Sequence, residues 1–263
     1  MPEGHTVHRT ANKFAKLFAN KQLEVSSPQG RITDYRLVSG QQLVSADAIG
    51  KQMFLFFEHA VVRVHLGIYG KWRFANFDDA APAPIGQVRA RFLSETSVAD
   101  LVGPTACEVI DSDQVALVQA RLGPDPLRQD LDGLELARFL AKAAMTRVAI
   151  GQFLMNQAAI AGIGNVYRAE LLFRQGINPH LPTNLVPTEL LEKIWQDASF
   201  LMQIGVKKGI MLTREGHLNG RPALADRYYV YKREGLPCRI CGAEVSLELM
   251  STRKLYWCRT CQK

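Results

Sequence analysis

Four cysteines near the end of the chain have the spacing of a metal site. Cys238, Cys241, Cys258 and Cys261 form C-x2-C-x16-C-x2-C, within the range typical of four-thiolate zinc sites. Each C-x2-C turn presents two thiolates to one tetrahedral ion, and the segment between the pairs is long enough for a hairpin. Structural disulfides are the alternative, which a cytosolic location disfavours. We expect one structural Zn²⁺, and we expect the isolated Cys107 to be a small buried hydrophobe.

A second segment, QAAIAGIGNVYRAELLFRQGINP, has the features of an anion site. The two glycines of AGIGN permit a tight double turn between two helices, and Asn165 is placed to cap the second helix. A helix N-terminus offers backbone N–H groups to an anion, so a DNA phosphate could dock there. An ordinary helical hairpin has the same pattern, and these residues alone leave both interpretations open.

The elements that must position these groups differ between the two halves of the chain. Residues 5–18 place apolar side chains at i, i+4, i+7 and i+11, which predicts a helix. Residues 51–77 are rich in β-branched and aromatic residues, and Val62, Val64 and Leu66 alternate with polar neighbours, as in a strand. QVRARFL and ACEVI are further strand candidates. The first half is therefore expected to be a leading helix and an antiparallel β-sandwich or barrel.

The second half is expected to be helical up to the cysteines. GPDPL, at residues 123–127, predicts an extended connector. Helical periodicity follows in LELARFLAKAA, VAIGQFLMNQAAI, NVYRAELLFRQ and PTELLEKIWQDASFLMQIG. The sequence thus predicts a multidomain α+β protein. Its expected parts are a β-sandwich domain (1–122), a linker (123–131), a helical domain (132–235) and a β-hairpin zinc finger (236–263).

Composition and charge narrow the class of protein. In a chain of 263 residues, 47% hydrophobic and 22% charged residues exclude wholesale disorder. The net charge is +7; residues 204–263 hold 12 Lys/Arg against 5 Asp/Glu, whereas residues 1–203 hold 20 of each. Positive charge clustered in this way is typical of a nucleic-acid binder, although a solvated basic face would look the same.

The sequence also predicts where the protein resides. No run approaches the roughly 18 consecutive apolar residues of a transmembrane helix. The N-terminal MPEGHTVHR is polar and charged where an export signal needs an apolar core. We therefore expect a cytoplasmic protein with no membrane partner.

Taken in order, several short segments resemble one family. They are MPEG at the start, Lys51 in AIGKQMF, HLGIYG, the GPDPL connector, the AGIGN turn and the terminal four-cysteine finger. Together they resemble the formamidopyrimidine-DNA glycosylase/endonuclease VIII family over nearly the whole chain, and MPEG with YGKWR favours the endonuclease VIII branch. The resemblance implies a two-domain clamp with DNA in its cleft. It also implies excision of oxidised bases followed by strand cleavage.

The resemblance assigns roles by position. Pro2 becomes the nucleophile once Met1 is removed, Glu3 the catalytic carboxylate and Lys51 the lysine of the sheet domain. The same resemblance makes Asn165 a phosphate contact and Arg253 the arginine at the tip of the finger hairpin. Ile68 and Tyr69 match the residues that fill the gap left by the everted base.

Physical chemistry supports the N-terminal roles independently. An α-amino group has a pKa near 8, against about 10.4 for lysine, so far more of it is neutral at pH 7. A helix starting just after Pro2 favours the neutral amine further. A secondary amine also gives a permanently cationic iminium, and the adjacent Glu3 can shuttle protons. The structural alternative is that Pro2 and Glu3 only begin a helix.

Structural alternatives exist for the other candidates too. Lys51 could be a strand-edge charge rather than a ligand of the phosphate beside the lesion, and Arg253 a solvated loop arginine rather than a bidentate phosphate ligand. Ile68 could pack inside a strand instead of wedging into a base stack.

One position departs from the family. Many relatives have a second glutamate three residues after the first, where this chain has Thr6, preceded by His5. The chain therefore has no carboxylate for proton transfer at this position. Either His5 or Thr6 compensates, or the rates and lesion preference differ.

The leading prediction is a monomeric, bifunctional DNA glycosylase/AP lyase of base excision repair. It would bind DNA containing oxidised bases or abasic sites, excise pyrimidines in preference, and cut by β,δ-elimination. The alternatives are a non-catalytic zinc protein that binds damaged or single-stranded DNA, and an oxidised-purine glycosylase of the same fold. An RNA-directed zinc ribbon is disfavoured, because a ribbon would not explain the first 200 residues.

Overall fold

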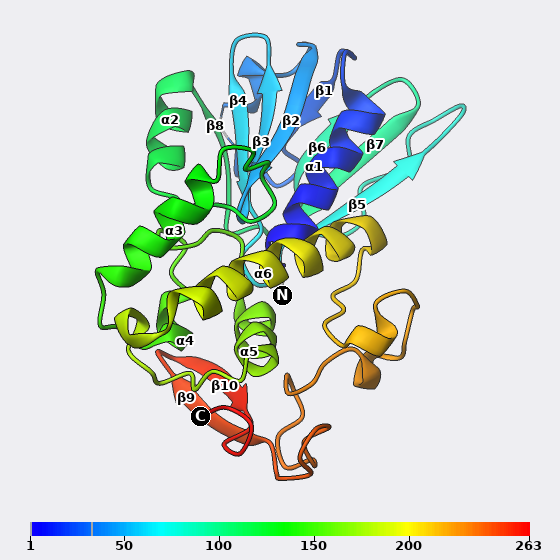
Figure 1. Cartoon of the computed structure of the whole chain (residues 1–263). Coiled ribbons are helices and arrows are strands. Elements are labelled where there is room, and N and C mark those ends of the chain that lie inside the picture. The colour runs from blue at the N-terminus through cyan, green and yellow to red at the C-terminus, as the bar shows by residue number, and fades with distance from the viewer. Residues whose placement is uncertain (1, 33) are drawn as a thin grey trace. The chain divides into compact units, whose positions relative to one another are not determined.

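The computed structural model describes residues 2–32 and 34–263. The chain forms two compact units, Met1–Arg121 and Leu122–Lys263 (Figure 1). Each unit has hydrophobic clusters of its own. The finer domain limits expected from the sequence stay predictions.

The first unit consists of a leading helix, α1 (Gly4–Phe18), and two antiparallel four-stranded sheets. One sheet has the order β1-β6-β7-β5 and the other the order β2-β3-β4-β8. The strands are β1 (Glu24–Ser26), β2 (Leu43–Ile49), β3 (Gln52–Phe57), β4 (Val61–His65), β5 (Lys71–Asn76), β6 (Val88–Leu93), β7 (Ser97–Val102) and β8 (Ala106–Ile110). A short helix, α2 (Ser112–Ala120), ends the unit.

The core of the first unit confirms the expected sandwich. One hydrophobic cluster joins α1 to both sheets, and α1 contributes Val7, Ala11 and Phe14 from its buried face. In β4, Val62 and Val64 are buried, whereas Arg63 and His65 are half-buried. This is the period of two that a strand imposes on its side chains. Cys107 is buried in the same cluster, as expected.

The second unit combines helices with a terminal β-hairpin. Its helices are α3 (Leu134–Ala144), α4 (Ile150–Phe153), α5 (Asn165–Arg174) and α6 (Thr188–Lys208). The hairpin consists of β9 (Ser246–Met250) and β10 (Arg253–Trp257), paired antiparallel. Side chains from all four helices form the main cluster, and β10 packs against α5 (Figure 1). The expected helical domain and β-hairpin finger are confirmed.

One predicted helix is much shorter than its periodicity suggested. Of VAIGQFLMNQAAI, only Ile150–Phe153 is α-helical. Beyond it, side-chain amides accept hydrogen bonds from the backbone: Oδ1 of Asn156 accepts from Ala158 N, and Oε1 of Gln157 accepts from Gly162 N. Asparagine and glutamine thus turn the chain while Leu154 and Ile160 stay buried.

The GPDPL segment is tied to this same turn region. The backbone N–H of Gly123 donates to the Gln157 carbonyl over 2.8 Å, and that of Ala161 donates to the Pro124 carbonyl over 2.8 Å. A Cβ on Gly123 would lie 2.6 Å from a backbone atom of Ala159, so only glycine fits there. The segment therefore forms part of the packing of the second unit.

Candidate DNA-processing site

Pro2 and Glu3 stand immediately before α1. Glu3 is the N-cap of that helix and is fully buried, and its carbonyl accepts from Thr6 N over 2.9 Å. Pro2 is half-buried. Because the apolar face of α1 is fixed in the core, the position of its first turn is fixed as well. The expected loss of Met1 concerns a residue outside the described part of the chain.

His5 and Thr6 occupy the first turn of α1, where the family pattern has its second glutamate. His5 is only 3% exposed, and its Nε2 lies 3.2 Å from the Thr6 hydroxyl. Burial, together with the positive charges of His8 and Arg9, lowers the pKa of His5 from 6.5 to about 3. The imidazole is therefore neutral at physiological pH.

Lys51 lies in the tight turn between β2 and β3, not on a strand edge. Gly50 has φ +56°, and Ile49 pairs with Gln52 across the turn. The Lys51 carbonyl lies 3.1 Å from Nδ1 of His65 on β4. The turn is thereby attached to the neighbouring strand, and the Lys51 side chain is half-buried.

The loop between β4 and β5 exposes two large apolar side chains. Ile68 is 46% exposed and Tyr69 is 83% exposed. A Cβ on Gly67 would lie 1.8 Å from the Thr105 hydroxyl, and one on Gly70 would lie 2.3 Å from the Leu66 carbonyl. The glycines therefore permit a compact loop that presents these residues outward. This exposure argues against a core-packing role for Ile68.

Asn165 begins α5 but does not cap it, which corrects the expectation from the sequence. Gly164 is the N-cap, and Gly162 in the preceding turn has φ +91°. The Asn165 side chain instead donates from Nδ2 to the Lys254 carbonyl over 2.9 Å. Because the side chain reaches across to the finger hairpin, the turn and the finger are joined at this point.

Two charged residues on α5 escaped the sequence analysis. Arg168 is 1% exposed and donates from Nη2 to the Lys254 carbonyl over 2.9 Å. Glu170 is fully buried, and its carboxylate accepts from the Thr213 hydroxyl and from the backbone N–H groups of residues 229–231 over 2.6–2.8 Å. In the sequence, their only sign is two charged residues within a largely apolar helical segment.

The four predicted cysteines come together in the finger. Their sulfur atoms all lie within 4.8 Å of one another, with Cys238–Cys261 at 3.9 Å and Cys241–Cys258 at 3.5 Å. A disulfide would need about 2.05 Å, whereas thiolates at about 2.3 Å from one tetrahedral ion lie about 3.8 Å apart. The N–H of Ala243 and the neighbouring thiols lower the pKa of Cys241 to about 7, whereas burial raises the pKa of Cys258 and Cys261. The donor set fits a metal ion.

Arg253 lies beside the tip of the β9–β10 hairpin of the finger. It opens β10, pairs with Met250 on β9, and is half-buried. The tip itself, Ser251–Thr252, has φ values of +47° and +65°. The predicted position at a turn between finger strands is therefore where this arginine lies.

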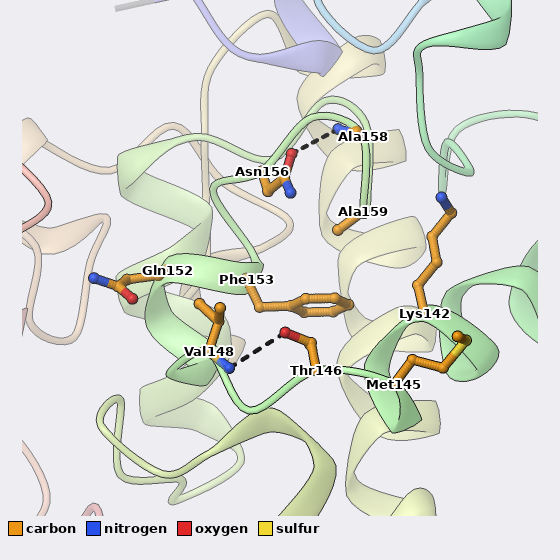
Figure 2. Close-up of a pocket in the computed structure, with 9 residues that line it drawn as sticks. All are labelled: Lys142, Met145, Thr146, Val148, Gln152, Phe153, Asn156, Ala158 and Ala159. Atoms are coloured by element: carbon orange, nitrogen blue, oxygen red, sulfur yellow. Dashed lines mark hydrogen bonds between the residues drawn. The ribbon is translucent and has the colours of Figure 1, made fainter.

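A pocket of about 300 Å³ lies between the end of α3, α4 and the loop that follows α4 (Figure 2). Its walls are largely apolar, with the ring of Phe153 inside it and Lys142 at one side. None of the residues expected to contact DNA lines it. The lining residues are Lys142, Met145, Thr146, Val148, Gln152, Phe153, Asn156, Ala158 and Ala159.

Comparison with known proteins identifies both units. The formamidopyrimidine-DNA glycosylase N-terminal domain matches residues 1–101, and the formamidopyrimidine-DNA glycosylase H2TH domain matches residues 122–215. Endonuclease 8 1 of Mycobacterium tuberculosis is 44% identical over the full length of both chains, and Endonuclease 8 2 of Mycobacterium bovis is 31% identical, again over both full lengths.

The fold has solved counterparts. A Lactococcus lactis Fpg (MutM), in complex with DNA containing N7-benzyl-Fapy-dG, superposes with a TM-score of 0.82 at 22% identity and covers all of both chains. The β-sandwich, the helix–two-turn–helix and the thiolate finger together define a DNA glycosylase of base excision repair. The chain belongs to the formamidopyrimidine-DNA glycosylase/endonuclease VIII family and is endonuclease VIII-like. Within residues 2–32 and 34–263, no helix has the length and apolar character needed to cross a bilayer.

Proposed function

We propose that the protein is a bifunctional DNA glycosylase/AP lyase that excises oxidised bases, preferring pyrimidines. It acts through an iminium on the N-terminal proline and cuts the strand by β,δ-elimination. The observation that carries this proposal is Pro2 directly ahead of a fully buried Glu3 at the start of α1. A carboxylate held at that point lies next in the chain to the nitrogen that becomes nucleophilic once Met1 is removed.

The chemistry follows from the secondary amine. Its nitrogen lone pair attacks C1′ of the sugar, and the bond to the base breaks with its electrons leaving on the base. The nitrogen then loses its proton, and its regenerated lone pair forms the C1′ iminium as the C1′–O4′ bond of the sugar ring breaks and O4′ takes up a proton. When a C2′ proton departs, the C–H electrons pass into the iminium to give an enamine, and the enamine expels the 3′ phosphate. Release of the 5′ phosphate follows. Glu3 transfers protons during opening of the sugar ring and elimination.

The remaining candidates hold the DNA. Lys51, Asn165 and Arg253 bind backbone phosphates, with Arg253 using its planar guanidinium as a bidentate donor. Ile68 and Tyr69 fill the space left by the everted base, in keeping with their exposure on a compact loop. The four thiolates would hold a structural Zn²⁺ and would leave it no open position for catalysis.

The preference for pyrimidines rests on the endonuclease VIII-like sequence and on the relatives named Endonuclease 8. The solved Fpg structures, at 22% identity, inform the fold only. An oxidised-purine preference on the same fold is therefore the second candidate, and a substrate panel separates the two.

The test is covalent trapping. Purified protein is incubated with duplexes that each carry one oxidised pyrimidine, oxidised purine or abasic site, in the presence of borohydride. We expect reduction of the iminium to join the N-terminus to DNA, most rapidly with pyrimidine lesions. Peptide mapping of the adduct should place the DNA on Pro2.

Two variants control the test. Pro2→Gly keeps an amine but loses the secondary-amine advantage, so it should trap weakly. A form in which Met1 is retained has an amide nitrogen at Pro2 and should bind DNA without trapping. If that form traps as well as processed protein, Pro2 is not the nucleophile, and Lys51 becomes the next candidate.

A further inference from the structure

The start of α5 and the finger hairpin meet at one backbone oxygen, the carbonyl of Lys254. Asn165 donates to it from Nδ2 over 2.9 Å, and Arg168 donates to it from Nη2 over 2.9 Å. The same Nη2 also donates to Oδ1 of Asn165 over 2.5 Å. Two side chains from successive turns of α5 and one carbonyl of β10 are therefore joined by three hydrogen bonds.

Because Arg168 is buried, the atoms to which its guanidinium donates indicate its role. Its side chain is 1% exposed and is among the largest fully buried side chains of the described chain. Burying a guanidinium is costly unless it is well hydrogen-bonded, and an apolar side chain would fill the same volume more cheaply. A planar donor that reaches a side-chain oxygen and a carbonyl together supplies direction, which an apolar side chain does not.

The hairpin tip has an unusual backbone conformation that directional hydrogen bonds can stabilise. Ser251 and Thr252 both have positive φ, and a β-branched residue such as Thr252 rarely adopts this conformation. Strained turns persist where the surroundings over-determine them. Here Gln152 of α4 donates to the Ser251 hydroxyl over 2.6 Å on one side of Arg253, and the Asn165–Arg168 pair binds Lys254 on the other.

We propose that Arg168 is a positioning residue that holds Asn165 and Arg253 as one preformed phosphate-binding unit. This inference rests on the proposed function, in which both residues are phosphate contacts. Arg168 itself does not touch the DNA. It removes the conformational freedom that the turn and the hairpin tip would otherwise lose on binding, so the contacts are made at lower entropic cost.

A mutant cycle tests the inference on the full chain. The binding partner is a duplex with a tetrahydrofuran abasic analogue, so no catalytic step enters the measurement. Arg168→Met fills the volume without donating a hydrogen bond, and we expect it to weaken binding about tenfold to a hundredfold, the range for losing a charged hydrogen bond. In an Asn165→Ala, Arg253→Ala background the same change should weaken binding less than about threefold, because contacts that are already missing cannot be mispositioned.

Matched variants separate positioning from stability. Leu201→Ala removes a fully buried side chain of α6 in the same unit. It should lower Tm at least as much as Arg168→Met yet leave affinity within about threefold when measured well below Tm. Arg168→Lys keeps a positive charge but lacks the planar fork. It should bind as weakly as Arg168→Met. If the methionine variant does not fold, Arg168→Lys takes its place in the mutant cycle.

The outcomes are distinguishable. Equal losses from Arg168→Met in both backgrounds, or full affinity in Arg168→Lys, would overturn the positioning role while leaving the proposed function intact. If Asn165→Ala and Arg253→Ala themselves leave affinity unchanged, the phosphate roles in the proposed function fail, and the positioning role fails with them. Borohydride trapping by the wild type remains an independent test of the chemistry.

Discussion

At the scale of single residues, the first turn of α1 assigns separate tasks to neighbouring side chains. Glu3 is fully buried beside Pro2, whereas His5 is buried and neutral and Thr6 is partly exposed. A carboxylate at Glu3 can accept and return a proton, and a hydroxyl at Thr6 cannot do so near pH 7. The proton transfers of this chain are therefore expected to depend on Glu3 more than on the position of the family's second glutamate.

Glu3→Gln should separate the two half-reactions. The amide keeps the shape of the carboxyl group but carries no proton to exchange. Excision of an oxidised base should fall by about 10²–10⁴-fold, the usual contribution of a positioned acid–base group. Cleavage of a preformed abasic site should fall less, because no glycosidic bond remains to be broken and only ring opening and elimination still use Glu3. Single-turnover assays on the two substrates measure this, and equal losses on both would show that Glu3 has no separate role in breaking the glycosidic bond.

His5 makes a prediction about pH and stability. Its pKa is about 3 when folded and about 6.5 in the unfolded chain, so the unfolded state binds the extra proton as pH falls. The stability that the neutral imidazole contributes is complete above about pH 6.5 and is lost at about 1.4 kcal/mol per pH unit below it. Between pH 6.5 and pH 5 the free energy of unfolding should therefore fall by about 2 kcal/mol from this group alone.

Urea unfolding of His5→Gln at the two pH values measures the effect. The variant should lose about 2 kcal/mol of the pH dependence, whatever its absolute stability. His59→Gln is the matched control, because His59 is exposed on the turn after β3. An unchanged pH dependence in His5→Gln would show that His5 is not the buried neutral group described above.

At the scale of elements, regular periodicity was predictable and turns built from side chains were not. The alternation around Val62 identified β4, and the spacing of Val7, Ala11 and Phe14 identified α1. Leu154 and Ile160 of VAIGQFLMNQAAI are buried, but the side chains of Asn156 and Gln157 bend the chain after one helical turn. Local amide hydrogen bonds of this kind leave no periodic signal.

The buried charges on α5 were hidden for a different reason. Arg168 finds its partner at Lys254, and Glu170 finds its partners at Thr213 and at residues 229–231. These partners lie 43–86 positions away in the sequence. A sequence pattern indicates which face of a helix is apolar, but not which distant residues pack against that helix. The four cysteines were predictable because both halves of the site have short, fixed spacing.

The exposed β4–β5 loop predicts a substrate-dependent defect. Ile68→Ala shortens an apolar side chain that is already 46% exposed, so its effect on folding should be small. Excision from duplex DNA should fall about tenfold or more, since interrupting a base stack costs a few kcal/mol per step. Excision from single strands should change little, because there is no stack to interrupt. Equal losses on the two substrates would instead favour a packing role for Ile68.

The finger predicts a metal dependence of binding, not of chemistry. Cys258 is buried, and its carbonyl accepts from Gln262 N over 3.0 Å, so the ligand and the chain end are ordered together. Cys258→Ser, or chelation, should release the metal, disorder the finger and weaken DNA affinity. Because four thiolates leave no open position, added metal beyond one equivalent should not speed the reaction. Metal analysis well below one zinc per active chain would contradict the structural role.

At the scale of the whole molecule, the net charge of +7 overstates the number of basic side chains that are available to contact DNA phosphates. All of the excess lies in residues 204–263. Arg214 and Arg227 lie in this segment and donate to the carbonyls of Asp226 and Pro222 within their own loop. Arg239 donates to the carbonyls of Ala225 and Tyr228. Part of the basic cluster therefore stabilises the loop, and a few contacts are left to determine the salt dependence of binding.

That salt dependence is predictable from the number of contacts. With about 4–6 phosphates neutralised, log K should fall with log salt at a slope of about −4 to −5. Raising salt from about 50 to 200 mM should then weaken binding roughly 250- to 1,000-fold. Arg253→Ala should reduce the magnitude of the slope by about one, because one counterion fewer is displaced. Ile68→Ala should weaken duplex binding without changing the slope, since it removes no charge. Fluorescence anisotropy across a salt series measures both variants, and an unchanged slope in Arg253→Ala would remove this residue from the set of phosphate contacts.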